Sequence, residues 1–321
     1  MCGLSERSQN PRLIAVAFAM VYLFWGSTYL AVRYGVETIP PLMLVGMRQL
    51  LAGIVLYPLA RFHSDEKPTL QHWLSGALIG GLLLIGGNGS IAWAEARLTP
   101  TNITAVLVAT VPVWMAIMDW LRPGGPRPTG RVLTALGIGL VGVSLLVSPH
   151  IPFLSSAGAA VTPWCAMVLV AGSLCWAAGS ILSRHLVLPR SPLIGTSIYL
   201  IAGGVMVFPL SLALGEGRNF DVRQISLRSG LSVLYLAMFG SILGFTAYTY
   251  LLRHVQPARV ATYAYINPVI AVILGWLFLH EPITGRMVVA AAIILGAVVM
   301  VITAPHAPAT EDASGQPVAP D

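Results

Sequence analysis

Ten apolar runs of about 20 residues alternate with short polar segments along this chain. An α-helix needs about 20 apolar residues to cross the roughly 30 Å hydrocarbon layer of a bilayer, so each run predicts one transmembrane helix. The runs cover residues 13–32, 41–61, 72–95, 101–121, 130–148, 163–184, 192–214, 229–252, 258–279 and 286–304. The pattern therefore predicts an all-α integral membrane protein with ten transmembrane helices.

The ten runs divide into two copies of five that resemble each other in sequence. The matching pairs are Trp25 and Trp176, Arg33 and Arg184, Gly53 and Gly204, and Pro58 and Pro209 at an offset of 151, then Gly87 and Gly244 at 157 and Pro112 and Pro268 at 156. Because each copy holds an odd number of spans, the second copy enters the bilayer in the opposite orientation. We expect an inverted 5+5 repeat, with the copies at residues 13–148 and 163–304. Such repeats build secondary transporters with the substrate site at the repeat interface.

Composition supports a membrane protein independently of the runs. Hydrophobic residues make up 56% of the chain, charged residues only 9%, and the mean hydropathy is +0.79, whereas about a quarter of the residues of soluble domains are charged. The net charge of +6 is spread between the runs, and a nucleic-acid site needs basic residues clustered on one face. Cys2, Cys165 and Cys175 form no CxxC pair, so we expect neither a metal site nor a cofactor.

The distribution of Lys and Arg predicts the orientation, because positive charge stays on the cytoplasmic side. With the N-terminus inside, the inner segments hold eleven Lys and Arg and the outer segments six. The first apolar run leads directly into Arg33 without a cleavage site, so we expect it to remain as a span. The prediction is a multi-pass inner-membrane protein with both termini, residues 1–12 and 305–321, in the cytoplasm. The second of these is rich in Ala, Pro and Gly and is predicted to be disordered.

Polar residues within the spans are candidates for function, because a polar group in hydrocarbon is costly and tends to face the bundle interior. Arg48 is predicted to be a counter-charge for an anionic group such as a carboxylate; the alternative is an arginine that snorkels or bonds between helices. Asn88 lies in the segment 86–90 (GGNGS). Its glycines predict either a broken helix that offers backbone groups to a ligand or close helix packing.

Two acidic residues at span ends are candidates for proton coupling. Glu95 ends the third span and is predicted to pair with Arg97 or Arg33, to carry a proton, or to be a solvated loop acid. Asp119 ends the fourth span, and Arg122, three residues later, is its expected helical partner. A proton-coupled cycle and simple facilitated exchange both fit the sequence.

Aromatic residues in the spans predict a cavity for amphipathic or apolar organic solutes, although aromatic residues at helical spacing also serve packing. With the polar candidates, the predicted substrate-binding residues are Trp25, Ser27, Arg48, Asn88, Trp93, Trp114, Trp176, Tyr248, Tyr263, Tyr265 and Asn267. Pro112 and Pro268 remove one backbone donor each at matching positions of the two copies, so we expect helix bends there that act as hinges.

Four stretches in order carry a family resemblance: residues 23–32 (LFWGSTYLAV), 105–114 (AVLVATVPVW), 265–268 (YINP) and 279–285 (LHEPITG). Together they resemble the EamA family of the drug/metabolite transporter superfamily, over residues 12–304. The resemblance implies ten helices, an inverted repeat, cytoplasmic termini and export of small metabolites or toxic compounds. Glu281 of the fourth stretch has no counterpart in the first copy, so its role is local to the second half.

Other classes of function fit the sequence less well. There is no Gly-x-Ser-x-Gly or His-Glu-x-x-His pattern for an intramembrane enzyme and no Walker A motif for ATP. A channel pore needs symmetry around an axis between chains, whereas an internal repeat favours a pathway within one chain. We therefore expect a secondary transporter that exports small organic metabolites, such as amino acids or related compounds, or drugs. The alternative is a nucleotide-sugar or phosphate-ester exchanger. The expected partners are the substrate and the lipid bilayer, and a homodimer is left open.

Overall fold

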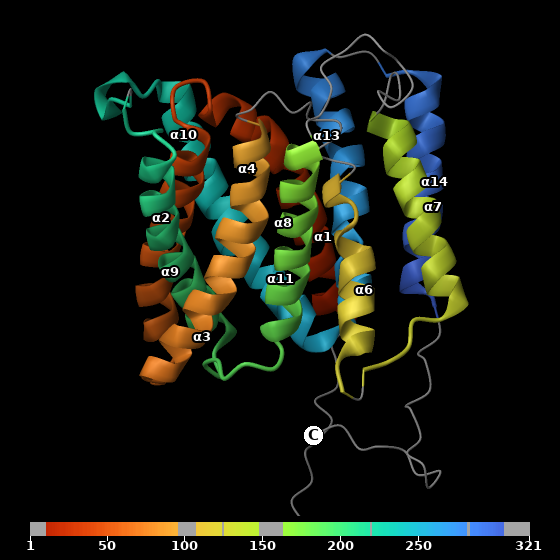
Figure 1. The fold of residues 1–321 in the computed structure, drawn as a ribbon, viewed down its shortest axis with the longest axis horizontal. Helices are drawn as coiled ribbons and strands as arrows, with labels where there is room; N and C mark the ends of the chain where they lie inside the picture. Colours follow the sequence, from red (N-terminus) through yellow and green to blue (C-terminus); the bar gives the residue numbers. More distant parts are fainter. Residues whose placement is uncertain are drawn as a thin grey trace, which may run out of the picture.

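The computed structural model describes residues 11–95, 107–123, 125–147, 163–218, 220–280 and 283–304. Within these ranges all regular secondary structure is helical, and the helices run side by side along one axis (Figure 1). Eight helices are long and apolar enough to cross a membrane, and two shorter apolar helices accompany them. The all-α membrane fold predicted from the apolar runs is confirmed.

The first copy contains α1 (Pro11–Gly35), α2 (Pro41–Phe62), α3 (Leu70–Gly80), the π-helix η1 (Gly81–Gly89), α4 (Ser90–Glu95), α6 (Val111–Leu121) and α7 (Gly130–Val147). The second contains α8 (Pro163–Leu182), α9 (Pro192–Ala213), the short 3-10 helix η2 (Val222–Gln224), α10 (Leu227–Tyr235), the π-helix η3 (Leu236–Leu243), α11 (Gly244–His254), α12 (Pro257–Val260), α13 (Tyr263–Leu279) and α14 (Gly285–Ile302). The predicted N-terminal segment up to residue 10, the start of the fourth span and the predicted tail lie outside the described residues.

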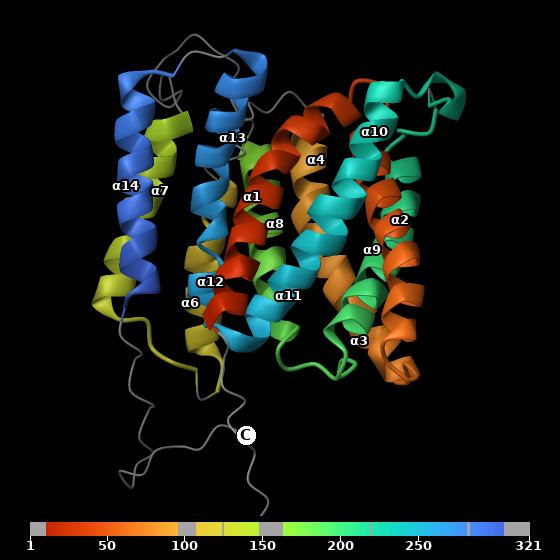
Figure 2. The ribbon, with the colours of Figure 1, turned by 180° about the vertical axis from the view of Figure 1, so that it is seen from behind.

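The two ends of the bundle differ in which parts of the chain they carry. Helix α1 begins and α14 ends at the lower end of Figures 1 and 2, which we name the terminal face. Helices α1 and α13 end, and α2 and α14 begin, at the opposite end, which we name the distal face. The charge distribution predicts that the terminal face is the cytoplasmic one.

Helices α2 and α9, which occupy the same place in the two copies, pack against each other in opposite directions. Gly53 and Gly204 lie at the crossing. A Cβ on Gly53 would stand 2.8 Å from the backbone N of Ile201, and a Cβ on Gly204 would stand 2.8 Å from the backbone N of Leu50. Only glycine admits such a close approach of two backbones. Both glycines of the pair with the 151-residue offset therefore lie in the contact between α2 and α9.

A glutamate from each copy binds the start of the equivalent helix in the other copy. The carboxylate of Glu66, after α2, accepts hydrogen bonds from the backbone N–H groups of Arg190 (2.9 Å) and Ser191 (3.0 Å), just before α9. The carboxylate of Glu216, after α9, accepts from the N–H groups of Leu42 (3.1 Å) and Met43 (3.1 Å) in the first turn of α2. Anions are favoured at helix N-termini, where N–H groups lack helical partners.

These reciprocal caps lie at opposite ends of the bundle, so each end of the α2–α9 pair is tied by one glutamate. Desolvation raises the pKa of Glu66, but the hydrogen bonds from Ser191 and Arg190 and the charges of His72 and Arg190 together lower it by more, so the pKa lies below its usual value. The carboxylate is therefore charged at neutral pH, as an anionic cap requires.

The third span of each copy contains a π-helix at its centre, η1 in the first and η3 in the second. At or beside each π-helix, a glycine packs directly against the tryptophan of the other copy. A Cβ on Gly87 would stand 2.5 Å from the Trp176 ring, and a Cβ on Gly244 would stand 2.4 Å from Nε1 of Trp25. Trp25 and Trp176 thus occupy equivalent positions in the two copies, and so do Gly87 and Gly244, as the offsets of 151 and 157 predict.

Candidate functional site

A cavity of about 750 Å³ lies between the two copies, within the size range of small-molecule sites. Most of its walls come from α1, α2, η1, α4, α8, η3, α11 and α13, with single residues from α6, α7 and α14. It reaches Val36, Pro41, Leu146 and Met287, which lie at or near the distal ends of their helices. The cavity therefore extends from the middle of the bundle toward the distal face.

Five aromatic side chains close the cavity on the side of the terminal face, and we name them the aromatic floor: Trp25, Trp176, Phe245, Tyr248 and Tyr263. The ring centroid of Trp25 lies 5.6 Å from that of Trp176, 5.3 Å from Phe245, 4.9 Å from Tyr248 and 4.7 Å from Tyr263. Tyr248 is 1% exposed and lies below the cavity lining, whereas the other four line it. Tilted and edge contacts of this kind are favourable geometries for aromatic rings.

The polar edges of the floor are bonded within the protein. Trp25 donates its indole N–H to the carbonyl oxygen of Gly240 at 2.9 Å. Trp176 donates to the Tyr248 hydroxyl at 3.2 Å, and this hydroxyl lies 2.6 Å from Oγ of Ser180. A bonded, close-packed layer of this kind excludes water, so the floor seals the cavity from the terminal face in this state.

Arg48 is the deepest residue of α2 that lines the cavity. Its side chain is buried, with the residue 8% exposed, and its Nε has no hydrogen-bond partner. None of the described carboxylates forms an ion pair with it. The structure therefore places a cation at the level of the aromatic floor without a counter-charge from the described part of the chain.

Helix α13 brings two hydrogen-bond acceptors to the same cavity. Asn267 is 5% exposed, and its Oδ1 has no partner. Pro268 lacks an N–H and cannot donate to the carbonyl of Ala264 one turn earlier. All three residues line the cavity. Pro268 thus lies within a continuous helix and faces the site, and its role as a hinge stays a prediction.

Asn88 also lines the cavity, from η1. The broken helix that its glycines allowed is wrong, because the third span continues without interruption from α3 through η1 to α4. The close packing that the glycines also allow is present, and the role of Asn88 toward a substrate stays a prediction. A Cβ on Gly86 would stand 2.5 Å from Cβ of Cys175, in addition to the contact of Gly87 with Trp176.

Several predicted site residues lie away from the cavity in this state. Tyr265 is fully buried between α7 and α13, where its hydroxyl donates to the carbonyl oxygen of Leu136 at 3.0 Å. Trp114 donates to Oγ1 of Thr110 at 3.1 Å. Ser27 bonds the hydroxyl of Tyr235 at 2.7 Å. These polar groups are bonded within the protein, and Tyr265, Trp114, Ser27 and Trp93 of α4 do not line the cavity in this state, so their role as substrate contacts stays a prediction.

Two of the remaining candidates, Asp119 and Pro112, do not line the cavity. Asp119 pairs with Nε of Arg122 at 2.6 Å near the terminal face, which confirms the expected helical pair. The side chain of Glu95 and the whole of Glu281 lie outside the described part of the chain. Pro112 stands in the first turn of α6, just after a turn at Ala109 and Thr110, so it starts a helix instead of bending one.

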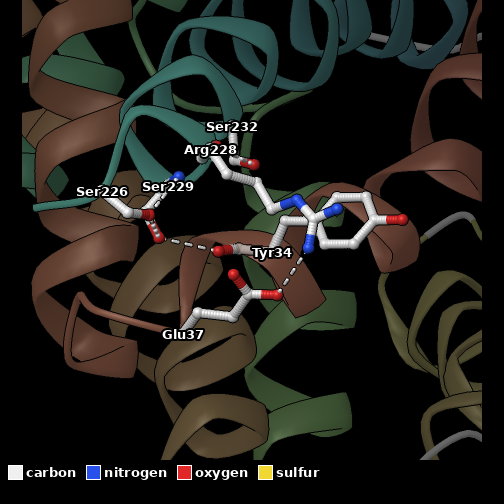
Figure 3. A network of polar contacts seen from close by, with 6 residues as sticks. All are labelled: Tyr34, Glu37, Ser226, Arg228, Ser229 and Ser232. Atoms are coloured by element: carbon white, nitrogen blue, oxygen red, sulfur yellow. Dashed lines mark hydrogen bonds and ion pairs between the residues drawn. The ribbon is translucent and has the colours of Figure 1, made fainter.

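A polar network fixes the distal end of α1, which forms part of the cavity rim (Figure 3). The guanidinium of Arg228 stacks 4.5 Å over the ring of Tyr34 and lies 3.4 Å from the carboxylate of Glu37. Ser229 donates its hydroxyl to the carbonyl oxygen of Tyr34 at 2.8 Å. The network therefore joins the last turns of α1 to the first turn of α10.

The sequence reasoning missed Phe245 as a member of the floor and Thr28 as a lining residue. An apolar ring in an apolar span gives no signal by hydropathy. The repeat offers one, because Phe245 aligns with Asn88 at the offset of 157, and both residues line the cavity.

The sequence profile of the EamA-like transporter family matches residues 12–148 and 163–303. Each match covers one of the two structural copies. The chain belongs to the EamA-like transporter family. The resemblance seen in the four sequence stretches is thereby confirmed, and so is the membership of the transporter class.

Relatives of this EamA-like protein include two bacterial transporters. It is 37% identical over 312 residues to the uncharacterized inner membrane transporter YedA of Escherichia coli K12, covering 95% of this chain and 97% of YedA. It is 24% identical to the probable amino-acid metabolite efflux pump of Salmonella typhimurium, covering 86% of this chain and 90% of the pump. A crystal structure with 16% sequence identity covers 90% of this chain and 96% of its own, with a TM-score of 0.72, so the two share the fold.

Proposed function

We propose that this protein is a secondary transporter that exports small organic metabolites, such as amino acids or related compounds, by alternating access. The observation that carries the proposal is a cavity between two inverted copies, extended toward the distal face and closed toward the terminal face by the aromatic floor. Inverted repeats with a site at their interface are typical of secondary transporters. The name of the Salmonella relative supports export of amino-acid metabolites.

The repeat supports a second state in which the cavity opens on the other side. The offsets of 151 and 157 align the lining residues Arg48, Asn88 and Ile91 with Tyr199, Phe245 and Tyr248. Tyr199 and Tyr248 are buried below the cavity, and Phe245 belongs to the floor. If the two copies exchange conformations, the distal cavity closes and a new one forms at the terminal face. With the N-terminus inside the cell, the state seen here faces the periplasm.

A nucleotide-sugar or phosphate-ester exchanger is the weaker candidate. Among the described lining residues, Arg33 and Arg48 are the basic ones. Arg33 follows Trp25 by eight residues on α1, a rise of about 12 Å, while Arg48 lies at the level of the floor. The two arginines thus stand at opposite ends of the cavity, whereas a phosphate group calls for several donors around one point.

Coupling of transport to protons would require an acidic side chain at the cavity. The described lining contains no carboxylate, and Asp119 is paired with Arg122 away from the cavity. A proton-coupled cycle through this site would therefore depend on Glu95, and facilitated exchange needs no such group.

Export itself can be tested by comparing metabolites outside cells that overexpress the chain with those outside empty-vector cells. We expect one or a few small organic metabolites to accumulate outside the overexpressing cells, and the purified protein to move the same compounds across proteoliposome membranes. Unchanged extracellular pools, together with no flux in proteoliposomes, would contradict a role in export.

The paired prolines give a prediction about the conformational cycle. Pro112→Ala and Pro268→Ala are expected to slow turnover several-fold and to change substrate binding by less than about twofold. At position 268 a restored N–H can bond to the carbonyl of Ala264 and stiffen α13, and at position 112 loss of the proline ring loosens the start of α6, so both changes affect interconversion more than contacts to the ligand. Equilibrium binding and transport rate are measured on the same purified variants. Unchanged turnover in both variants would show that the prolines serve packing alone.

A further inference from the structure

The charge of the cavity restricts which solutes it can take. Its described lining contains no Asp, Glu, Lys or His, and its deep end holds Arg48, a buried arginine that forms no ion pair with a described carboxylate. Charge interactions are strong inside a membrane protein, because little water screens them. A cavity of this composition attracts anions and repels organic cations, although its aromatic floor by itself would suit both.

Arg48 concentrates that charge at one point. Removing a cation from water costs several kcal/mol unless a partner of opposite charge compensates it, and the described residues supply no such partner. The guanidinium faces a cavity large enough for a metabolite. A carboxylate is the group that matches its planar fork of donors, with two parallel hydrogen bonds. The missing counter-charge is therefore one that a ligand brings.

The level of Arg48 in the bundle fixes where the rest of that ligand lies. Trp25, Trp176 and Tyr263 are the deepest lining residues of α1, α8 and α13, as Arg48 is of α2. A Cβ on Gly240, whose carbonyl accepts the Trp25 indole N–H, would stand 3.8 Å from Nη1 of Arg48. A carboxylate bound there has aromatic faces beside it, so the body of the ligand that they favour is apolar or aromatic.

The opposite side of the cavity carries acceptors instead of donors. Asn267 and Ala264 belong to α13, which lies on the other side of α1 from α2 in Figure 2. Asn267 lines the cavity with an amide whose Oδ1 is buried without a partner, and Pro268 cannot donate a hydrogen bond to the carbonyl of Ala264. Both groups leave an acceptor unfilled on this side, which suits a donor on the ligand. An ammonium group on the same molecule as the carboxylate meets that requirement.

We propose that the cavity selects organic carboxylates with an apolar body, that Arg48 binds the carboxylate, and that Asn267 accepts a hydrogen bond from an amino group where the ligand has one. This inference rests on the proposed transport function and names its substrate class. It predicts preference for anions and zwitterions over cations of the same shape.

The test uses three probes that share a phenylethyl body: 3-phenylpropionate carries only the carboxylate, phenethylamine only the ammonium, and L-phenylalanine both. Their binding to the purified protein is measured by calorimetry or by thermal shift. We expect the first and third to bind, and phenethylamine to bind at least about tenfold more weakly. Arg48→Ala should weaken binding of both carboxylates about 10- to 100-fold. Arg48→Lys should restore only part of it, because an ammonium lacks the fork.

Two further variants separate the roles. Asn267→Ala should weaken L-phenylalanine about 3- to 10-fold and leave 3-phenylpropionate unchanged within about twofold. Arg131→Ala removes an exposed arginine at the start of α7 and should change nothing, which controls for net charge. Size-exclusion profiles and thermal unfolding establish that each variant is folded; if Arg48→Ala does not fold, Arg48→Lys and the wild-type preference among probes decide.

Equal binding of phenethylamine, wild-type binding of carboxylates by a folded Arg48→Ala variant, or no binding of any of the three probes would each overturn the inference. The transport function would survive those results if proteoliposomes still move another solute found outside overexpressing cells. The proposed transport function would be contradicted only if the proteoliposomes move no solute.

Discussion

Replacing Gly204 by alanine should destabilise the protein by about 1–3 kcal/mol, the usual cost of forcing extra volume into a packed contact. The new Cβ would stand 2.8 Å from the backbone N of Leu50 and 3.1 Å from its Cα. Backbone atoms cannot move aside as the end of a flexible side chain can, so α2 and α9 would have to separate. Gly53→Ala should act in the same way, because its Cβ would meet Ile201 of α9 at 2.6 Å from Cγ1.

The control for this prediction is Gly296→Ala in α14, where a Cβ would meet nothing within 4 Å. Alanine favours a helix over glycine by about 0.5–1 kcal/mol, so this variant should be as stable as the wild type or more so. The midpoint of thermal unfolding in one detergent is compared for all three variants. A Gly204→Ala midpoint equal to that of Gly296→Ala would show that the crossing tolerates a side chain, and the central role of the α2–α9 pair would be lost.

The sequence predicted most of the fold because spans are long and their composition is extreme. The third predicted span, residues 72–95, is a continuous helical segment from Leu70 to Glu95. Its π-helical centre was not predicted, because hydropathy reports burial and not the hydrogen-bond register of the backbone. The reciprocal caps of Glu66 and Glu216 were missed for a related reason. They lie in loops, where loop length shifts the offset to 150 and nothing apolar marks the positions.

The site was predictable where a polar residue interrupts an apolar run. Arg48, Asn88 and Asn267 were identified on that basis, and all three line the cavity. Aromatic residues gave mixed results, because helical spacing cannot tell which neighbour a ring will meet. Tyr263 lines the cavity, while Tyr265, two residues later, points to Gly139 of α7, where a Cβ would stand 2.6 Å from its ring. That choice depends on a tertiary contact.

Exchange of conformations between the two copies predicts a reversal of accessibility across the aromatic floor. Thr28 lines the cavity above the floor. Ser180 is fully buried and lies one turn beyond Trp176 toward the terminal face, bonded to Tyr248. A cysteine at position 28 should thus react from the distal side, and a cysteine at position 180 should react from the terminal side only after the floor opens. Ala52, buried beside the α2–α9 crossing, supplies a control position that should stay unreactive.

The most direct measurement is the labelling of Thr28→Cys, Ser180→Cys and Ala52→Cys in membrane vesicles of known orientation. Cys2, Cys165 and Cys175 are first replaced by alanine, and the retained transport rate is checked. The reagent is a membrane-impermeant thiosulfonate with a sulfonate group, because the arginine-lined cavity would repel a cationic one. We predict that the cysteine at position 28 reacts from the periplasmic side and the cysteine at position 180 only from the cytoplasmic side. Labelling of both from the same side, or no labelling at position 180 from either side while transport proceeds, would contradict alternating access through the aromatic floor.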